Sequence, residues 1–329
     1  MADFTDRRGA VAASQATAPQ IKLGQLAFRA ALSVGLAALF LYLLQSRVAS
    51  IDLDAVARSI GTVSVTQWGL AALATAISFW AVGQYDAALH RHYGTGVPSN
   101  VASRAGVAAI AVSQTLGLGV VTGAILRWRM LPGIDLWAAT RMTFAVTVSF
   151  LAGWAAVTAM TLLILPQAPF KFLSLIVLTA VLGLTALCLI APTLTLRGRI
   201  FRLPNGFTLS RVLVLTAVDT GAAALALFAL CPPDLAMPFT TLLPAFLIAL
   251  GAGLVSGAPG GVGAFEVTLL ALLPTAPEAP LLAAILAYRA IYYAIPAVAG
   301  AGLTAWGPSE ADRKRRAVWP ADPELATLA

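Results

Sequence analysis

The chain has 329 residues, of which 59% are hydrophobic and only 11% are charged. Soluble domains are about 25% charged, so this composition excludes an ordinary soluble enzyme and indicates a protein that lies largely in lipid. The net charge of +7 would suggest nucleic acid as a partner in a soluble protein. In a membrane protein the same excess of Lys and Arg is expected in loops at the cytoplasmic face.

The N-terminal segment, positions 1–24, is too polar and too acidic for a signal peptide. We therefore expect the long apolar segment that follows it to remain as a first transmembrane helix. The two cysteines, Cys188 and Cys231, lie in or beside apolar segments. A disulfide framework or a zinc site would need more cysteines at closer spacing, so we expect no metal and no cofactor.

Six segments have the length and composition of membrane-crossing helices, which need about 20 apolar residues. They are Leu26–Leu44, Trp68–Leu89, Met142–Leu165, Phe172–Pro192, Val212–Cys231 and Leu281–Leu303. Two further apolar stretches, Val101–Leu126 and Phe239–Leu273, are interrupted by clustered glycines. Each of these stretches is either a single crossing or a re-entrant hairpin that returns to its own side.

The distribution of Lys and Arg favours the hairpins. With both stretches re-entrant and the N-terminus inside, 17 of the 21 Lys and Arg residues lie inside, three lie outside and Arg289 lies in the membrane. With two single crossings the split is 11 to 9. Because positive residues are enriched in cytoplasmic loops, we predict an all-α multi-pass membrane protein with about six spans, two glycine-broken re-entrant hairpins and both termini in the cytoplasm.

The two glycine segments are similar to each other. Leu116–Ala124 aligns without a gap on Leu250–Ala258, and six of the nine aligned positions are identical. Asp86 precedes the first segment by nearly the same distance as Asp219 precedes the second. We interpret the chain as two copies of a span, an Asp-bearing span, a hairpin and a span, in opposite orientations, which is the inverted-topology repeat of many secondary transporters.

This interpretation sets the expected domain boundaries. Residues 1–24 form a cytoplasmic N-terminal segment, residues 25–305 form the membrane domain, and residues 306–329 form a basic cytoplasmic tail. The first repeat covers about residues 25–165 and the second about residues 171–305. The hairpins should meet around a cavity, because irregular backbone at membrane depth must be satisfied by protein or water.

Charged side chains in the spans are candidate functional residues, because an ionised group near the bilayer centre costs roughly 2.5 kcal/mol or more. Asp86 and Asp219 lie in corresponding spans, although Asp86 is close enough to a loop to lie at the interface. Arg127 and Arg129 flank Trp128 just after the first glycine segment. These arginines are either interfacial residues with an aromatic anchor or ligands of a phosphate.

The second glycine segment and the last span supply the other candidates. Gly260 and Gly261 should leave backbone groups exposed to a ligand, and Glu266 follows them closely. Arg289, near the middle of the last span, needs an anion, which Glu266, Asp219 or a ligand phosphate could provide. We predict that Glu266 and Arg289 approach within salt-bridge distance or share a bound phosphate.

Three longer motifs keep the order found in a known family. They are Thr122–Met130 (Thr-Gly-Ala-Ile-Leu-Arg-Trp-Arg-Met), Pro259–Glu266 (Pro-Gly-Gly-Val-Gly-Ala-Phe-Glu) and Tyr288–Pro296 (Tyr-Arg-Ala-Ile-Tyr-Tyr-Ala-Ile-Pro). Together with Tyr85-Asp86 and Asp219, they resemble the bacterial lysylphosphatidylglycerol synthase/flippase family, also called multiple peptide resistance factor. The resemblance covers the chain from about residue 65 to residue 305.

The resemblance implies a flippase in the bacterial inner membrane that moves an anionic or aminoacylated phospholipid, such as lysyl-phosphatidylglycerol, between leaflets. Under this hypothesis Arg127 and Arg129 hold the lipid phosphate, while Asp86, Asp219 and Glu266 attract a cationic headgroup or balance the arginines. The family's soluble aminoacyltransferase domain has no counterpart in this sequence, so we expect a transporter without catalytic residues.

Two alternatives stay open. One is a coupled transporter of a small solute or ion, which the acidic residues at repeat-related positions also suit. The other is a non-transporting membrane partner of a lipid-modifying enzyme. We expect membrane phospholipid as the partner and no nucleic acid, and the sequence leaves the oligomeric state open, a homo-oligomer included.

Overall fold

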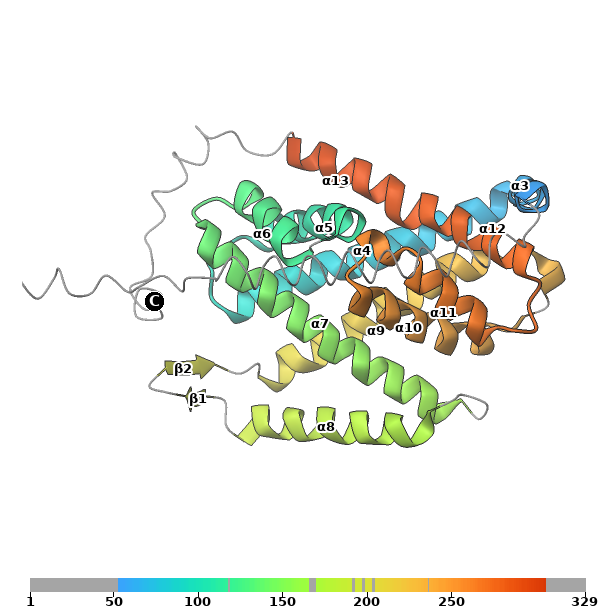
Figure 1. Ribbon diagram of the computed structural model, residues 1–329. Helices are drawn as coiled ribbons and strands as arrows, with labels where there is room; N and C mark the ends of the chain where they lie inside the picture. The colour runs from blue at the N-terminus through green and yellow to red at the C-terminus, as the bar shows by residue number, and fades with distance from the viewer. Residues whose placement is uncertain are drawn as a thin grey trace, which may run out of the picture.

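The computed structural model is a bundle of helices (Figure 1) and describes residues 53–117, 119–165, 170–190, 193–196, 199–202, 205–235 and 237–305. The α-helices are α3 (Leu53–Gly61), α4 (Val65–His92), α5 (Ser99–Leu116), α6 (Gly119–Met130), α7 (Leu136–Ile164), α8 (Lys171–Ile190), α9 (Gly206–Leu230), α10 (Phe239–Ser256), α11 (Ala264–Leu272), α12 (Glu278–Tyr288) and α13 (Ile295–Ala305). The predicted segments 1–24 and 306–329 lie outside the described residues.

Shorter elements join the helices. The 3₁₀ helices are η1 (Pro233–Leu235) and η2 (Pro259–Gly261), and a π-helix, η3 (Arg289–Ala294), connects α12 directly to α13. Strands β1 (Thr193–Leu196) and β2 (Arg199–Arg202) pair as a small antiparallel hairpin between α8 and α9. The pattern of apolar spans gave no indication of this β-hairpin or of α3.

Six of the described helices are long and apolar enough to cross a membrane: α4, α7, α8, α9, α10 and the continuous helix Glu278–Ala305. Five of them match predicted spans, and the predicted first span at residues 26–44 lies outside the described residues. The sixth, α10, is the first arm of the second glycine-broken stretch. The prediction of an all-α multi-pass membrane protein is therefore confirmed, with the β-hairpin as a small addition.

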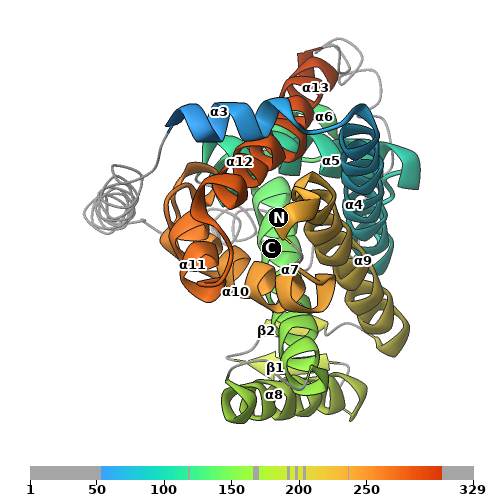
Figure 2. The ribbon, with the colours of Figure 1, turned by 90° about the vertical axis from the view of Figure 1, so that its right-hand side faces the viewer.

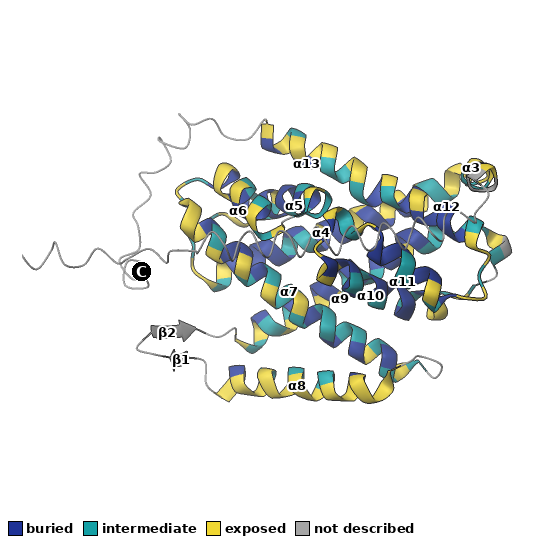
Figure 3. Ribbon diagram, viewed as in Figure 1, coloured by how far each residue is buried: buried dark blue, intermediate teal, exposed yellow. Residues whose placement is uncertain are grey.

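The exposure of the helices follows from their sequences. Helix α8 is apolar on all sides, lies against α7 at one edge of the bundle (Figure 2), and is exposed over most of its length (Figure 3). A helix that is apolar all round must be covered by protein or by lipid. About half of the apolar windows of α9 and α10 is buried inside the bundle, against 11% for α8, so α8 leaves the larger apolar surface for lipid to cover.

Both glycine-broken stretches are helical hairpins. In the first, α5 and α6 pack against each other on either side of the break, and in the second α10 and α11 do the same. The breaks occur where glycines have positive φ angles, a conformation that costs glycine little and other residues more. These glycines are Gly117, Gly257, Gly260, Gly261 and Gly263.

The tips of the two hairpins contact each other. A Cβ atom placed on Gly117 would lie 3.3 Å from the Cα atom of Pro259. In Figure 1 the α5–α6 hairpin lies toward the end of the bundle where α4 ends, and the α10–α11 hairpin lies toward the end where α9 ends. This is the arrangement that hairpins entering from opposite sides of a membrane require.

Helix α10 approaches α7 closely because Gly251 has no side chain. The indole of Trp154 on α7 donates a hydrogen bond of 3.1 Å to the Leu247 carbonyl on α10. A Cβ atom on Gly251 would lie 2.5 Å from Cη2 of that indole. Van der Waals contact therefore excludes any larger residue at this position without movement of the ring.

We predict that Gly251→Ala lowers stability by about 1–3 kcal/mol, because the added methyl group overpacks the contact with Trp154. Gly221→Ala is the matched control, since no atom lies within 4 Å of a Cβ atom placed there and alanine favours a helix over glycine. Apparent melting temperatures in one detergent measure both effects. Equal melting temperatures for the two variants would contradict the packing argument.

A second prediction concerns the sides of the membrane. Asn100, in the first turn of α5 at the start of the first hairpin, and Thr275, after the second, are both exposed, and the positive-inside rule places them on opposite sides. In a Cys188→Ala, Cys231→Ala background, an impermeant thiol reagent should label Thr275→Cys in intact cells and label Asn100→Cys only after lysis. The reverse pattern would invert the topology, and labelling of both from outside would refute it.

Candidate functional site

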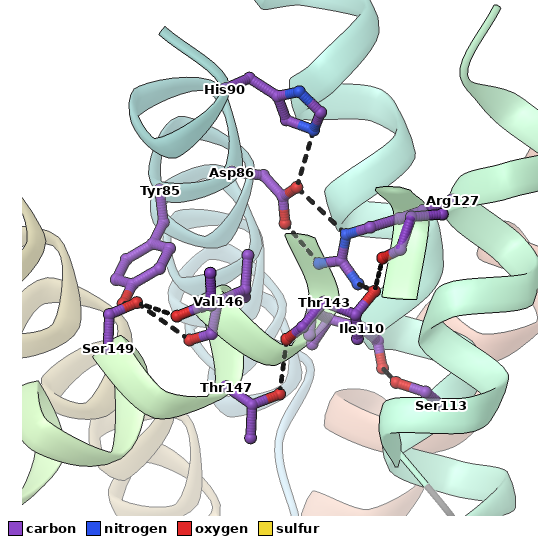
Figure 4. Close-up of polar contacts among 12 residues, drawn as sticks. Tyr85, Asp86, His90, Ile110, Ser113, Arg127, Thr143, Val146, Thr147 and Ser149 are labelled. Carbon is purple, nitrogen blue, oxygen red and sulfur yellow. Dashed lines mark hydrogen bonds and ion pairs between the residues drawn. The ribbon is translucent and has the colours of Figure 1, made fainter. Parts of the chain in front are cut away.

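A buried ion pair joins the Asp-bearing helix α4 to the first hairpin. Nη2 of Arg127 lies 2.5 Å from Oδ2 of Asp86, and Nε lies 3.2 Å from Oδ1 (Figure 4). The two side chains are 0% and 1% exposed. Two parallel hydrogen bonds between a guanidinium and a carboxylate are a strong and directional contact, so this pair fixes α6 against α4.

Small residues make room for the Asp86–Arg127 pair. A Cβ atom on Gly106 of α5 would lie 2.5 Å from Cγ of Asp86, and one on Gly123 of α6 would lie 3.2 Å from Nη1 of Arg127. Nη1 also donates to the Thr143 hydroxyl of α7 at 3.3 Å. The pair is therefore enclosed by four helices, α4, α5, α6 and α7.

The burial of these residues bears on the interfacial interpretation of the arginines, while phosphate binding stays a prediction. Arg127 is fully buried, so the interfacial interpretation is wrong for this residue. Arg129 is exposed on α6, and its Nε donates to the Thr304 carbonyl of α13 at 3.3 Å. Asp86 is buried rather than solvated at an interface, and the imidazole of His90 lies 3.8 Å from its Oδ1.

A second ion pair joins the second hairpin to the last span. Nη2 and Nε of Arg289 lie 2.6 and 2.8 Å from Oε1 of Glu266. The Glu266 side chain is 5% exposed and that of Arg289 is 14% exposed. The predicted approach of these two residues is confirmed. The guanidinium also lies over the rings of Phe265 and Tyr293, at 5.3 and 4.6 Å, where cation–π attraction adds to the pairing.

The glycine turn before α11 is bonded within the protein. Oε2 of Glu266 accepts from the Gly263 N–H at 2.7 Å, and Arg289 donates to the Gly260 carbonyl. The N–H of Gly261 donates to the Ala258 carbonyl at 2.8 Å. The Gly260 carbonyl and the Gly261 N–H, two of the backbone groups that we expected to be exposed to a ligand, are thus bonded within the protein, and both residues are half-buried.

The buried carboxylate Asp219, on α9, has a different environment. Its Oδ1 accepts a hydrogen bond from the Ser78 hydroxyl of α4, and the Tyr292 hydroxyl lies 3.5 Å away. Ser78 and Tyr292 are also 2.8 Å from each other. The three residues come from α4, α9 and η3, so the carboxylate lies where both repeats contact the last span.

The π-helix η3 has a cause in the sequence. Pro296 has no N–H, so the Tyr292 carbonyl loses the donor four residues later that an α-helix would supply. The side chain of Gln114, near the tip of the first hairpin, donates to this carbonyl at 3.2 Å. Sequence reasoning did not single out Ser78, Gln114 or Tyr292 as site residues. The proline at position 296, within a predicted span, could have indicated that the carbonyl of Tyr292, four residues earlier, needs another hydrogen-bond donor.

A polar cavity of about 480 Å³ lies between α4 and the start of α5. It is lined by Gln84, Ser99, Asn100, Ser103 and Arg104. A cavity at the meeting point of the hairpins stays a prediction. Within the described ranges, no group of three or more His, Cys, Asp or Glu residues is placed to hold a metal ion.

The long apolar helices define an all-α multi-pass membrane protein, and the buried ion pairs lie within its helix bundle. The chain is 30% identical over 236 residues to the uncharacterized protein slr0712 of Synechocystis sp. (strain ATCC 27184 / PCC 6803 / Kazusa), covering 67% of this chain and 73% of that protein. The chain therefore belongs to the same family as that Synechocystis protein. No family model matches the chain.

A shorter similarity links the chain to a protein with a named activity. Over 67 residues it is 43% identical to a phosphatidylglycerol lysyltransferase of Staphylococcus haemolyticus (strain JCSC1435). The aligned part is 20% of this chain and 8% of that protein. This similarity agrees with the family resemblance of the sequence motifs over a limited part of the chain.

We predict strong coupling between Glu266 and Arg289. Arg289→Ala should lower stability by about 3–5 kcal/mol, because it leaves a buried carboxylate without its partner. Glu266→Gln combined with Arg289→Gln should be more stable than Arg289→Gln alone, since no charge is left unpaired. Thermal unfolding in detergent, or folded yield where a variant is too unstable, gives the double-mutant cycle. Additive effects of the single changes would contradict the pairing.

Proposed function

We propose that this protein moves an anionic or aminoacylated phospholipid, such as lysyl-phosphatidylglycerol, between the leaflets of the bacterial inner membrane. The observation that carries the proposal is the buried Asp86–Arg127 pair, which joins an Asp-bearing span to a hairpin whose tip meets a second hairpin. The similarity to a phosphatidylglycerol lysyltransferase supports a lipid of this class as the substrate.

A buried ion pair can exchange partners with a lipid headgroup that carries both signs of charge. The phosphate of lysyl-phosphatidylglycerol would take the guanidinium of Arg127, which suits the planar fork geometry of arginine. An ammonium group of the same headgroup would take the carboxylate of Asp86. The exchange gives both Arg127 and Asp86 a new partner of opposite charge, so neither protein group is left as an isolated ion in the low-dielectric interior, where such an ion is costly.

The same argument explains a preference among headgroups. Phosphatidylglycerol carries a phosphate and no ammonium group, so its binding to Arg127 would leave the Asp86 carboxylate without a partner. An aminoacylated headgroup supplies both charges. The buried pair therefore favours the aminoacylated lipid over phosphatidylglycerol, whereas a site with arginine alone would favour phosphatidylglycerol.

Two further features fit a pathway for lipid. Arg129 is exposed two residues after Arg127 and can make the first contact with a phosphate at the surface of α6. The Glu266–Arg289 pair of the second hairpin offers the same combination of charges. In this proposal the protein is a transporter rather than an enzyme, membrane phospholipid is its partner, and both termini are cytoplasmic.

The test is lipid movement in vesicles that contain the purified protein. Fluorescent lysyl-phosphatidylglycerol and phosphatidylglycerol are placed in the inner leaflet, and quenching by external dithionite measures their arrival outside. We expect wild-type protein to move the lysyl lipid faster. Asp86→Asn should slow the lysyl lipid roughly tenfold or more, because hydrogen bonds to charged groups contribute about 1.5–3 kcal/mol.

Lys171→Gln is the control, because Lys171 is an exposed residue at the start of α8, away from the ion pairs. It should leave the rate unchanged. Melting temperatures of all variants separate loss of function from loss of fold. No movement of either lipid above protein-free vesicles would refute the proposal, and movement of phosphatidylglycerol alone would refute the argument from ion-pair exchange.

A further inference from the structure

The three buried carboxylates in the described helices do not have equivalent partners. Asp86 and Glu266 each pair with an arginine. The described hydrogen-bond partners of Asp219 are the hydroxyl groups of Ser78 and Tyr292. Asp219 is 8% exposed, so it is nearly as buried as the paired carboxylates while its neighbours supply dipoles instead of a positive charge.

The internal repeat explains this difference. In the gapless register that aligns the two glycine segments, the position of Arg127 corresponds to Gly261. A Cβ atom on Gly261 would lie 2.9 Å from Cα of Gly253, so close helix packing occupies the space. The first hairpin therefore carries a guanidinium that neutralises its aspartate, and the second hairpin carries no side chain at the corresponding position.

The other titratable groups around Asp219 do not replace the missing guanidinium. Helices α4, α7, α8, α10 and α12 pack against α9. Four phenols lie close enough to Asp219 to interact with it electrostatically, those of Tyr85, Tyr288, Tyr292 and Tyr293. Helix α10 has no titratable residue. On α4 the charged and histidine residues Asp86, His90, Arg91 and His92 lie two turns or more beyond Ser78. Arg141, Lys171, Glu278 and Arg211 lie near the starts of α7, α8, α12 and α9 itself. Arg289, near the middle of the last span, is already paired with Glu266.

A buried carboxylate with hydroxyl partners can exist in two protonation states at modest cost. Ionised, it accepts a hydrogen bond from the Ser78 hydroxyl, whose oxygen can in turn accept from the Tyr292 hydroxyl 2.8 Å away, and this chain offsets part of the cost of burying the charge. Protonated, the acid is neutral and donates to Ser78, so the Ser78 hydroxyl turns toward Tyr292, which must then accept. Uptake of a proton therefore changes the hydrogen bonding of Tyr292 without leaving a charge unpaired.

Tyr292 lies in the element that touches both hairpins. Its backbone carbonyl accepts from Gln114 near the tip of the first hairpin, and Arg289 in the same π-helix donates to the Gly260 carbonyl of the second. π-helices occur often at functional sites. A change at the Tyr292 hydroxyl therefore acts on the same short element whose contacts hold the two hairpin tips.

We propose that Asp219 is a proton-binding site that couples the movement of the hairpins to a proton gradient. An Oδ–H bond forms when a proton enters from water on one side, and it breaks when the proton leaves to the other side. The bound proton releases the Tyr292 hydroxyl from its donor role, and through η3 this biases the contacts of both hairpins. The coupling to lipid, but not the proton site, rests on the proposed function.

The first experiment measures proton binding without transport. Infrared difference spectra of the protein in lipid, recorded across pH, report the carbonyl stretch of a protonated carboxylic acid. We expect a band that titrates with pH in wild-type protein and is lost in Asp219→Asn. It should persist to higher pH in Tyr292→Phe, because the hydrogen-bond chain that stabilises the ionised carboxylate loses its second hydroxyl. Asp86→Asn is the control and should keep the band. A band that survives Asp219→Asn overturns the proposal.

The second experiment measures coupling in vesicles with an imposed pH difference. One coupled proton can bias the distribution of lipid between leaflets by at most about tenfold per pH unit. We expect such a bias with wild-type protein and an even distribution with Asp219→Asn, which mimics the protonated state. A bias that remains in Asp219→Asn, or one that follows a sodium gradient at constant pH, overturns the proposal.

The two experiments separate the proposals. If the carboxylic acid band titrates as expected but no lipid moves in wild-type vesicles, the proton site is supported and the lipid substrate is refuted. If lipid moves without any response to pH and the band is absent, lipid translocation stands and the proton site is refuted.

Discussion

A guanidinium buried among apolar helices requires an anion within hydrogen-bonding distance, and the arrangement of both hairpins depends on this requirement. Arg127 on the return arm of the first hairpin is bound to Asp86 on α4. Glu266, just beyond the turn of the second hairpin, is bound to Arg289 in the last span. Breaking a buried pair costs about 3–5 kcal/mol, so each hairpin is held to a long helix by one strong interaction.

The glycines of these segments act through the space that they leave. Gly106 and Gly123 allow the Asp86–Arg127 pair to lie between packed helices, and Gly251 admits the indole of Trp154. Where Gly253 faces Gly261, the backbone of α10 contacts the backbone of the turn. In lipid there is no hydrophobic driving force between helices, so their association depends on close van der Waals packing, which small residues allow. The glycine clusters are therefore needed for packing as well as for the turns.

Much of the fold could be predicted because a membrane span is a long and strong sequence signal. The pairing of Glu266 with Arg289 was predictable for a similar reason, since a membrane arginine has few candidate anions. The same reasoning applied to Arg127 would have selected Asp86, but the fork geometry of the guanidinium suggested a phosphate, and Asp86 was named only as one of three carboxylates that could balance the arginines. The β-hairpin was not predictable from hydropathy, because its strands are short and lie in a polar connection.

The hydroxyl partners of Asp219 could not be predicted, because Ser78 and Tyr292 are 141 and 73 residues away and serine and tyrosine have no patterned spacing. What the sequence did contain is the asymmetry between the repeats, with Arg127 in one hairpin and Gly261 at the corresponding position of the other. Two copies with identical charges would give two equally stable orientations of a headgroup. A guanidinium in one copy and a hydroxyl-bound carboxylate in the other make the two repeats chemically different, so under the proposed function they would present different groups to a headgroup.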